Sequence, residues 1–472
     1  MKAYRNYIHI GVVTYILLFA SCDKWLDVAP QTQIEAERVF EKESGFQDAL
    51  TGVYVKMTNE QLYGRELTFG MVDGLGGQFN GQTSANQYYS TVNYDYDEEN
   101  FISKSGDLFE NSYNTIANIN TLIDQINEKG SGLFSGVNYH VIRGEAYGLR
   151  ALLHFDLVRL YGSSIASNGE TELALPYMDA VGTVPKERLT TRAFLNRVIA
   201  DLDIATEELR GYDPIVPTNA ANASVYLRDR TFKLNYYAVR ALQARVLLYA
   251  GDKVGALAAA REVIESNVFG WTPSSEIATF DESNRNKIFT QELIFCLNIS
   301  NMATVTSPFY DPEVSGNLLA RSPYEYESLF DPVDYRFVYL TRFNESIWRR
   351  YSTKLIQNGS TAFSNRMPIL RKSELYYIAA ECLSDTDPTA SVAYLDEVRR
   401  HRNLLDELSP TLTSDQIEAQ IRLEYRREFI GEGQLFYYYK RKNASQIDGV
   451  YVTMNEETYV LPLPDREIFY GQ

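Results

Sequence analysis

The spacing of small and apolar residues between Leu234 and Ser266 restricts the fold of this chain more than any other feature. These residues recur at intervals that let two antiparallel helices approach closely on either side of a turn, at Ala244, Leu247, Gly251, Ala256, Ala260 and Val263. A helix pair of this kind cannot bury its apolar face alone, so it must stack on further pairs. The segment therefore predicts a scaffold of stacked helix pairs.

Other segments repeat this tetratricopeptide-type pattern more loosely. One copy is indicated by Ala380, Leu383 and Asp387. An earlier one is indicated by helices expected over residues 143–161 and 191–209, with a long insertion between them. A further helix, over residues 414–430, is opened by a capping box of Thr413 and Gln416. The sequence thus predicts a mainly α fold of stacked helix pairs.

Strand signals are few, because period-two alternation is rare. Short strands are expected at residues 293–299 and 449–452. Two long segments, at about residues 60–108 and 270–365, are predicted to lie on the surface as loops. Loops of that length are uncommon unless they bind something. They are therefore the first places to look for a ligand site.

The amino terminus carries the pattern of a lipoprotein signal peptide. A positive flank of Lys2 and Arg5 precedes an apolar run over residues 8–19, and the small residues Ala20 and Ser21 precede Cys22. The alternative, a membrane-spanning helix, needs about 20 apolar residues, and this run is shorter. We predict a signal peptide over residues 1–21, lipidation of Cys22 and a flexible tether over residues 22–37.

Charge excludes one class of partner. The chain has 45 Lys and Arg against 62 Asp and Glu, and loss of Lys2 and Arg5 with the signal leaves a net charge of about −19. Nucleic-acid binding rests on a basic patch, so it is not expected. Cys296 and Cys382 lie in apolar surroundings and are interpreted as small buried residues, with a disulfide as the alternative.

The residues offer little support for catalysis. After the signal, the histidines are His140, His154 and His401, and none stands in a zinc-protease spacing or beside a nucleophile elbow. His154 falls within an amphipathic helix and is interpreted as a packed or capping residue. No pair of carboxylates stands out as a glycosidase pair. An enzyme is not predicted.

An acidic segment near residue 95 resembles half of a calcium loop. Asn93, Asp95 and Asp97 alternate there, but Glu98 stands where Gly is needed and Lys104 where a bidentate Glu is needed. An EF-hand is therefore excluded. A solvated acidic loop is preferred over some other oxygen-ligand cation site, and neither a metal nor a cofactor is predicted.

The same early loop is rich in tyrosine. It holds Tyr88, Tyr89, Tyr94 and Tyr96, beside the amides of Asn86, Gln87 and Asn93. The apolar face of a sugar ring stacks on an aromatic ring while its hydroxyls seek paired hydrogen bonds. The loop is therefore a candidate glycan site. The alternative is that these rings fill gaps between the loop and the helical scaffold.

A series of sequence blocks, taken in their order along the chain, resembles the SusD/RagB family of nutrient-binding outer-membrane lipoproteins. The blocks are FQDALTGVY (46–54), SYNTIANINTLI (112–123), GEAYGLRALLHFDLVRLYG (144–162), IADLDIATEEL (199–209), LRKSELYYIAAECL (370–383), LDEVRRHRN (395–403), LEYRREFIGEG (423–433) and LPLPDREI (461–468). The chain departs from the family at Tyr425 and Leu435, where Arg is usual, and at Tyr438, where Asp is usual. These departures mark a divergent branch.

The resemblance implies a single SusD-like domain over residues 38–472, divided into an N-terminal part (38–230) and a part with the tetratricopeptide-like unit and the SusD/RagB C-terminus (231–472). It implies a lipid-anchored protein on the outer membrane, facing the cell surface, that binds an oligosaccharide or other oligomeric nutrient and delivers it to a SusC-like TonB-dependent transporter. Ligand-facing aromatics are then expected in the early loop and in the middle region, at Phe309, Tyr310, Tyr324, Tyr326 and Trp348.

A second hypothesis keeps the helix pairs and drops the nutrient. A tetratricopeptide-type lipoprotein could act as a scaffold that assembles envelope proteins on its concave face. The long aromatic loops and the order of the blocks along the whole chain favour the nutrient-binding hypothesis.

Overall fold

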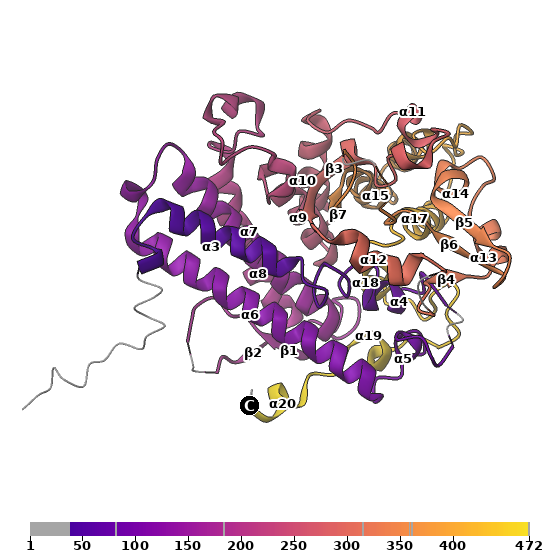
Figure 1. Ribbon diagram of the computed structural model, residues 1–472, viewed down its shortest axis with the longest axis horizontal. Helices are drawn as coiled ribbons and strands as arrows, with labels where there is room; N and C mark the ends of the chain where they lie inside the picture. Colours follow the sequence, from indigo (N-terminus) through magenta and orange to yellow (C-terminus); the bar gives the residue numbers. More distant parts are fainter. Residues whose placement is uncertain are drawn as a thin grey trace, which may run out of the picture. The chain divides into compact units, whose positions relative to one another are not determined.

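The computed structural model describes residues 38–80, 83–182, 185–313, 316–357, 359 and 362–470 (Figure 1). The expected signal peptide, Cys22 and the tether over residues 22–37 therefore lie outside the described residues. The chain forms two compact units, residues 1–46 and 47–472, and the fold given below is that of the second unit. Within the described ranges, no helix combines the length and the apolar content needed to cross a bilayer.

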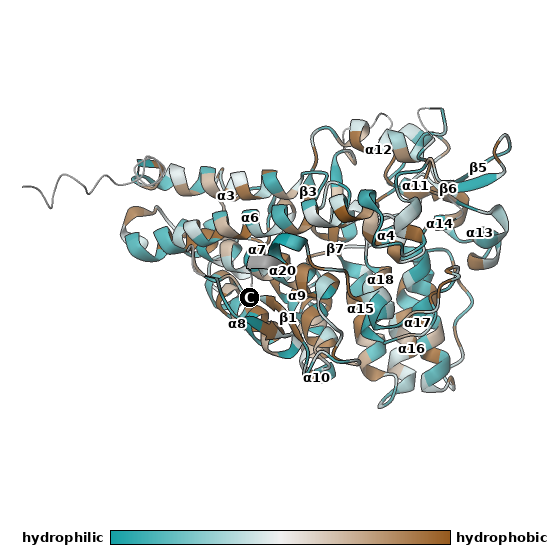
Figure 2. Cartoon of the chain, turned by 90° about the horizontal axis from the view of Figure 1, so that it is seen from below, coloured by the Kyte–Doolittle hydropathy of each residue, from teal (hydrophilic) through white to brown (hydrophobic). Residues whose placement is uncertain are grey.

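The core of the second unit is a stack of helices. The longer helices are α6 (Glu99–Lys129), α7 (Asn138–Tyr161), α8 (Thr191–Arg210), α9 (Tyr236–Tyr249), α10 (Lys253–Glu265), α15 (Lys372–Leu383), α16 (Pro388–Arg400) and α17 (Ser414–Glu428), while α3 (Glu43–Met57) spans the boundary. Along the stack α7 packs on α6 and α8, α9 on α8 and α10, and α15 on α10 and α16. In Figure 2 these helices carry hydrophilic and hydrophobic bands, as amphipathic helices do. The predicted mainly α fold of stacked pairs is confirmed.

The α9–α10 pair forms as its spacing predicts. Gly251 makes the turn with a φ of +87°, a conformation that favours glycine. Asp252 then caps α10 by accepting a hydrogen bond from the backbone N–H of Gly255 at 2.9 Å. Ala244 of α9 and Ala256 of α10 are fully buried, and a Cβ on Gly255 of α10 would lie 3.1 Å from a methyl group of Leu247 of α9. Small side chains thus allow the close approach.

The other two pairs also form. Asp387 caps α16 by accepting from the backbone N–H of Ala390 at 3.0 Å. α7 begins five residues before its predicted start at residue 143, and α8 ends at Arg210. A Cβ on Gly148 of α7 would lie 2.5 Å from a methyl group of Leu234, so a larger residue here would require Leu234 to shift. The α17 capping box of Thr413 and Gln416 is present as predicted.

The first long segment, at residues 60–108, is not a surface loop. Residues 62–79 are almost all buried, and they form tight turns and the short α4 (Met71–Leu75). α5 (Tyr89–Val92) follows, and α6 begins within the segment at Glu99. Because the segment is rich in glycine, a search for the apolar period of a helix does not reveal that it is buried. A Cβ on Gly433 would lie 2.4 Å from the carbonyl oxygen of Leu67, so the backbone at Gly433 approaches this segment closely.

The second long segment, at residues 270–365, is also folded. It carries β3 (Leu293–Asn298), β4 (Ala320–Arg321), β5 (Thr341–Asn344) and β6 (Arg349–Ser352), with β7 (Arg366–Arg371) just beyond it. β3 pairs with β7, and β4, β6 and β5 form an antiparallel sheet in that order. Its helices are α11 (Ser274–Ile277), α12 (Met302–Tyr310), α13 (Pro323–Leu329) and α14 (Tyr335–Leu340). Short elements of this size escape a search for long periodic runs.

The strand predictions divide. The strand at 293–299 is confirmed as β3, but residues 449–452 form an irregular loop, and that prediction is wrong. Gly449 has a φ of +84°, which breaks an extended strand. The other strands are β1 (Leu173–Pro176) and β2 (Arg188–Thr190), which pair in the insertion between α7 and α8. The remaining helices are α18 (Leu435–Arg441), α19 (Glu456–Tyr459), α20 (Asp465–Tyr470) and the 3-10 turns η1 (Ser131–Leu133), η2 (Pro217–Asn222), η3 (Arg230–Phe232), η4 (Glu282–Asn284) and η5 (Thr290–Glu292).

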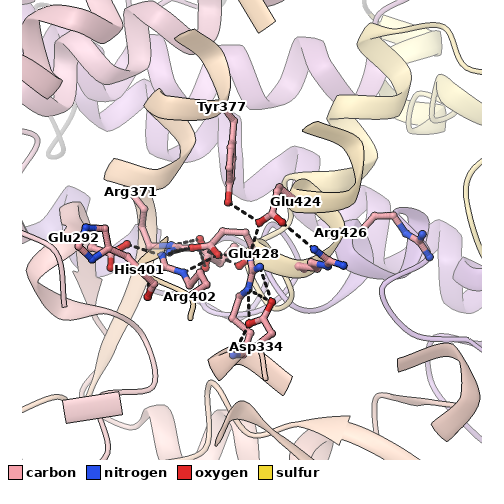
Figure 3. A network of polar contacts seen from close by, with 12 residues as sticks. Glu292, Asp334, Arg371, Tyr377, His401, Arg402, Glu424, Arg426 and Glu428 are labelled. Carbon is pink, nitrogen blue, oxygen red and sulfur yellow. Dashed lines mark hydrogen bonds and ion pairs between the residues drawn. The ribbon is translucent and has the colours of Figure 1, made fainter. Parts of the chain in front are cut away.

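A buried network of ion pairs links α17 to short elements of the segment at residues 270–365 and to β7 (Figure 3). At its centre the carboxylate of Glu428 accepts hydrogen bonds from Arg336, Arg371 and Arg402, at 2.6 to 3.1 Å. The network also includes the carboxylates of Glu292, Asp334, Glu424 and Glu432. All these side chains are almost completely buried. We call this set the Glu428 network.

The loop that follows α17 connects the Glu428 network to α4. There the carboxylate of Asp73 accepts from the backbone N–H groups of Gly431 and Gly433, at 2.6 and 2.8 Å. Burial raises the pKa of Asp73 to about 7, and the two backbone donors oppose that rise by favouring the ionised form. α4 is thereby tied to residues more than 350 positions away in the sequence.

Candidate functional site

A cleft of about 160 Å³ lies where three segments of the second unit meet. Its walls come from the end of α4 and the turn after it, from α5, and from the loop at residues 449–452. The lining residues are Gly74, Gly77, Phe79, Asn80, Tyr89, Val92, Asn93, Gly449, Val450, Tyr451 and Val452. We call it the Tyr89–Tyr451 cleft, because these two tyrosines are 44% and 96% exposed.

α5 is fixed by the residue next to Tyr89. The hydroxyl of Tyr88 donates to the carboxylate of Glu66, with both oxygens at 3.1 Å, and its ring packs on Phe79 and Phe309. Burial raises the pKa of Tyr88 well above its ordinary value, and the negative charge of Glu66 adds to the effect, so the hydroxyl stays protonated as a donor. With Tyr88 anchored inside, the adjacent Tyr89 is left with an exposed ring.

The turn between α4 and α5 is held from both sides. The hydroxyl of Tyr94 donates to the backbone carbonyl of Leu75, and Asp73 anchors α4 from the other side. The hydroxyl of Tyr96 donates to the carbonyl of Thr458 at 2.6 Å, and its ring stacks on Phe101 with centroids 4.5 Å apart. These contacts fix the segments on either side of α5, which lines the cleft.

The third wall is an irregular loop closed by its own hydrogen bonds. The backbone N–H of Val450 donates to the carbonyl of Ile447 at 3.0 Å, and the amide of Gln446 donates to the carbonyl of Val450 at 3.0 Å. Across the cleft, the amide nitrogen of Asn80 lies 3.4 Å from the carbonyl oxygen of Gly449. Tyr451, at the tip of this loop, is almost completely exposed.

The structure separates the nine aromatic residues predicted to face a ligand. Four have buried rings and pack in the core of the second unit: Tyr88, Phe309, Tyr310 and Tyr326. Tyr94 and Tyr96 are half-buried with their hydroxyls bound to backbone carbonyls. Exposed rings remain at Tyr89, Tyr324 and Trp348, and of these Tyr89 lines the cleft. For the four core residues the gap-filling alternative describes their position, because a buried ring offers no free face to a sugar.

Sequence reasoning missed Tyr451, because residues 449–452 were assigned to a strand. The available signal was an aromatic residue two positions after a glycine. Phe79 and Asn80 were also missed, since the segment around them was treated as an undifferentiated surface loop.

The histidines have structural contacts. His154 is fully buried, with Nδ1 3.0 Å from the carbonyl oxygen of Arg150 and Nε2 accepting from the backbone N–H of Met178 at 3.1 Å. Burial lowers its pKa to about 3. Its interpretation as a packed residue is confirmed. The ring of His140 stacks on Tyr212 with centroids 3.7 Å apart, and that of His401 on Trp271 at 4.4 Å.

The residue types that hold metals form no site in the part of the chain that the structure describes: no group of three or more His, Cys, Asp and Glu residues there could hold an ion. Asn93, Asp95 and Asp97 are each exposed, which fits the solvated acidic loop. Cys296 and Cys382 are both buried free thiols, so the disulfide alternative is wrong.

The positions that depart from the family pattern lie in the core. The rings of Tyr425 and Tyr438 stack with centroids 4.7 Å apart, and Leu435 is buried beside α4. Arg441, at the end of α18, makes two hydrogen bonds to the carboxylate of Glu381, both at 2.6 Å. The divergence therefore concerns packing around α18.

Comparison with known proteins connects both halves of the chain to one family. A SusD-like profile described as "Starch-binding associating with outer membrane" matches residues 24–226, and the profile of the SusD family matches residues 332–462. SusD-like protein P25 of Formosa agariphila is 22% identical over 299 residues, 61% of this chain and 52% of P25, so the chain spans about half of that relative. SusD-like protein P2 of the same organism is 23% identical over 535 residues, 99% of this chain and 97% of P2.

Solved structures share the fold. A SusD superfamily protein of Bacteroides thetaiotaomicron has a TM-score of 0.70 at 22% identity, over 91% of this chain and 98% of that one. Surface glycan-binding protein A of the same organism, in complex with laminarihexaose, has a TM-score of 0.67 at 15% identity, over 91% and 97% of the two chains. The two profile matches, the relatives and the shared fold make this chain a member of the SusD/RagB family.

Proposed function

We propose that the Tyr89–Tyr451 cleft binds a glycan. The observation that carries the proposal is the pair of exposed tyrosine residues, Tyr89 on α5 and Tyr451 on the loop at residues 449–452, that line one cleft together with Asn80 and Asn93. Sugar rings present apolar faces to aromatic side chains and hydroxyls to amides. Family membership supports binding as the activity, as does the laminarihexaose complex of a protein with the same fold.

The size of the cleft suits a surface site more than a closed pocket. Its volume of about 160 Å³ is below the roughly 300–1,000 Å³ of pockets that enclose drug-sized ligands. A longer oligosaccharide would therefore place one part in the cleft and extend along the surface. Since each aromatic contact contributes about 0.5–1.5 kcal/mol beyond its buried area, the affinity should be weak to moderate.

The test is calorimetry with a panel of oligosaccharides on the wild type and on Tyr89→Ala and Tyr451→Ala. Each variant should weaken binding about two- to tenfold, with melting temperatures unchanged. Trp348→Ala is the matched control, because Trp348 is an exposed aromatic residue that does not line the cleft. If Trp348→Ala weakens binding while both tyrosine variants bind as the wild type does, the site belongs near the β5–β6 turn.

We further propose that the protein is held at the outer membrane by a lipid on Cys22 and delivers its ligand to a SusC-like TonB-dependent transporter. The sequence pattern at residues 1–22 supports the anchor, and the family description supports the membrane association. Cys22→Ser should abolish acyl labelling and release the protein into the soluble fraction. Co-purification of the wild type with a large barrel protein would support delivery, whereas recovery of several unrelated envelope proteins would favour the scaffold hypothesis.

A further inference from the structure

Asp73 connects two of the walls of the Tyr89–Tyr451 cleft. It lies on α4 directly before Gly74, which lines the cleft, and it is only 2% exposed. Its two carboxylate oxygens accept from the backbone N–H groups of Gly431 and Gly433, and we call these two hydrogen bonds the Asp73 contact. α18 begins two residues after Gly433 and leads to the loop at residues 449–452, which forms another wall.

The two walls are closely packed. α4 and α18 lie side by side (Figure 1), and a Cβ atom on Gly76, at the end of α4, would lie 2.9 Å from the backbone nitrogen of Phe436 in α18. A Cβ atom on Gly77 would lie 2.7 Å from a methyl group of Val450 in the loop. With so little space between them, a shift of α4 changes its spacing to α18 and to the loop. The position of α4 is therefore part of the shape of the cleft.

The Asp73 contact joins α4 to a turn that other groups hold in place. Glu66 accepts from the first backbone N–H of α4 and Tyr94 donates to its last carbonyl, and these partners lie 5 and 19 positions from the residues they bind. The turn is fixed separately, because Glu432 at its centre pairs with Lys354 and Arg371. When the Asp73 contact is broken, α4 is therefore the side that moves.

The contact needs both oxygens of Asp73 as acceptors. An ionised carboxylate offers two acceptor oxygens, whereas a protonated one turns one of them into an O–H donor. Protonation sets that O–H against a backbone N–H, so one of the two hydrogen bonds is lost. An asparagine fails in the same way, because its amide nitrogen is a donor. The contact therefore depends on the charge of Asp73 as well as on its shape.

The surroundings of Asp73 place this change near neutral pH. Burial raises the pKa of Asp73 to about 7, the N–H groups of the turn and Lys354 oppose the rise, and Glu432 adds to it. Tyr310 of α12 and Tyr326 of α13 also act on Asp73. Burial raises the pKa of both tyrosines and the charge of Asp73 adds to the effect, so both stay protonated at neutral pH.

α5 and α18 also pack on α4. α5 contributes the exposed Tyr89, and burial raises the pKa values of the α18 tyrosines at 437–439. Arg441 is paired with a carboxylate, and Lys440 donates to two backbone carbonyls. Burial lowers the pKa of Lys440 to about 7, so a variant of Asp73 is needed to assign a pH effect in this range.

We propose that Asp73 is a positioning residue for the Tyr89–Tyr451 cleft, and that its ionised form holds α4 where the cleft binds a glycan. The inference rests on the proposed function of the cleft. Asp73 does not line the cleft and acts through Gly74 and Gly77, which do. Glycan affinity should therefore fall as the pH falls through 7. By linkage, a bound glycan should lower the pKa of Asp73.

Selective ¹⁵N-glycine labelling tests the proposal without a ligand. Gly431 and Gly433 report the Asp73 contact, Gly77 reports the turn after α4, and Gly449 reports the other wall. Between pH 6 and pH 8 these four amide resonances of the wild type should shift with one midpoint near 7, and this titration should be absent in Asp73→Asn. If the two turn glycines titrate and the two cleft glycines do not, or if none titrates, Asp73 does not position the cleft. The wild-type titration decides this even where Asp73→Asn fails to fold.

Calorimetry at pH 6, 7 and 8 then tests binding. Laminarihexaose is the probe, because a protein of the same fold binds it and its own charge does not change with pH. If only the ionised form binds, the wild-type affinity at pH 6 should be about tenfold lower than at pH 8. Asp73→Asn should bind weakly with a flat profile. Asp201→Asn is the matched control, because Asp201 is a buried aspartate that pairs with Arg150 between α7 and α8, and it should keep the wild-type profile.

The two proposals fail separately. Laminarihexaose binding that Tyr89→Ala and Tyr451→Ala leave unchanged contradicts the glycan site. Binding that both variants weaken, with a pH profile that is flat in the wild type or unchanged in Asp73→Asn, keeps the glycan site and overturns the role of Asp73. If the wild type does not bind laminarihexaose, the glycine titration still decides whether Asp73 positions the cleft.

Discussion

The α9–α10 contact and the Glu428 network bury their side chains to the same degree with opposite chemistry. In the first, Ala244 and Ala256 let two helices that are neighbours in sequence approach closely. In the second, Arg402 pairs with Glu428 and with Glu292, which lies 110 positions before Arg402. The helix contact is local and non-directional, whereas the network is long-range and needs every partner in place. The two regions should therefore respond differently to substitution and to pH.

The largest effect is expected from Glu428→Gln. This change removes the carboxylate shared by Arg336, Arg371 and Arg402 and leaves each of these buried cations with one carboxylate partner fewer. Breaking a buried pair in this way costs about 3–5 kcal/mol of unfolding free energy. Denaturant unfolding measures the cost.

A matched control is Glu397→Gln, which breaks the more exposed pair between Glu397 and Arg400. Surface pairs of this kind contribute about 0–1 kcal/mol. If Glu428→Gln costs no more than Glu397→Gln, the network does not hold the C-terminal elements together.

Acid should weaken the network and leave the helix contact unaffected. Burial alone would raise the pKa of Glu424, but Arg336 and Arg427 lower it to about 2. The unfolded value is about 4.3, so the stabilisation from Glu424 is complete above that pH and is lost as the pH falls toward 2. Denaturant unfolding between pH 6 and 3 should show falling stability for the wild type and a flatter profile for Glu424→Gln. Parallel profiles would contradict this.

Replacing either of two adjacent tyrosines, Tyr88 or Tyr89, should change the free energy of unfolding by very different amounts. Tyr88→Ala removes a fully buried ring and its bond to Glu66, and should cost about 3–5 kcal/mol. Tyr89→Ala removes an exposed ring and should cost less than about 0.5 kcal/mol. Denaturant unfolding of both variants checks the difference. Similar costs would mean that the ring at position 88 is not part of the core.

The contrast also explains what could be predicted from the sequence. The helix pairs were predictable because a local spacing determines both the helices and their contact, as at Ala244, Gly251 and Ala256. The burial of residues 62–79 was not, because it depends on Asp73 meeting Gly431 and Gly433 from the far end of the chain. Beside the cleft, the buried Tyr88 and the exposed Tyr89 cannot be told apart from the sequence. Contacts with Glu66 and Phe309 determine that Tyr88 is the buried ring.

An effect smaller than those of Glu428→Gln and Tyr88→Ala is expected at the helix contact. Ala256→Leu inserts a larger side chain where α9 and α10 meet, and overpacking of this kind costs about 1–3 kcal/mol. Val254→Leu, on the same helix but exposed, is the control and should change stability by less than about 0.5 kcal/mol. Because overpacking at Ala256 acts through the volume of an apolar side chain, the loss in Ala256→Leu should be the same at pH 4 and pH 7, in contrast to the network variants. An unchanged melting temperature would mean that the two helices do not meet at Ala256. A pH-dependent loss would mean that the stack and the Glu428 network are one coupled unit.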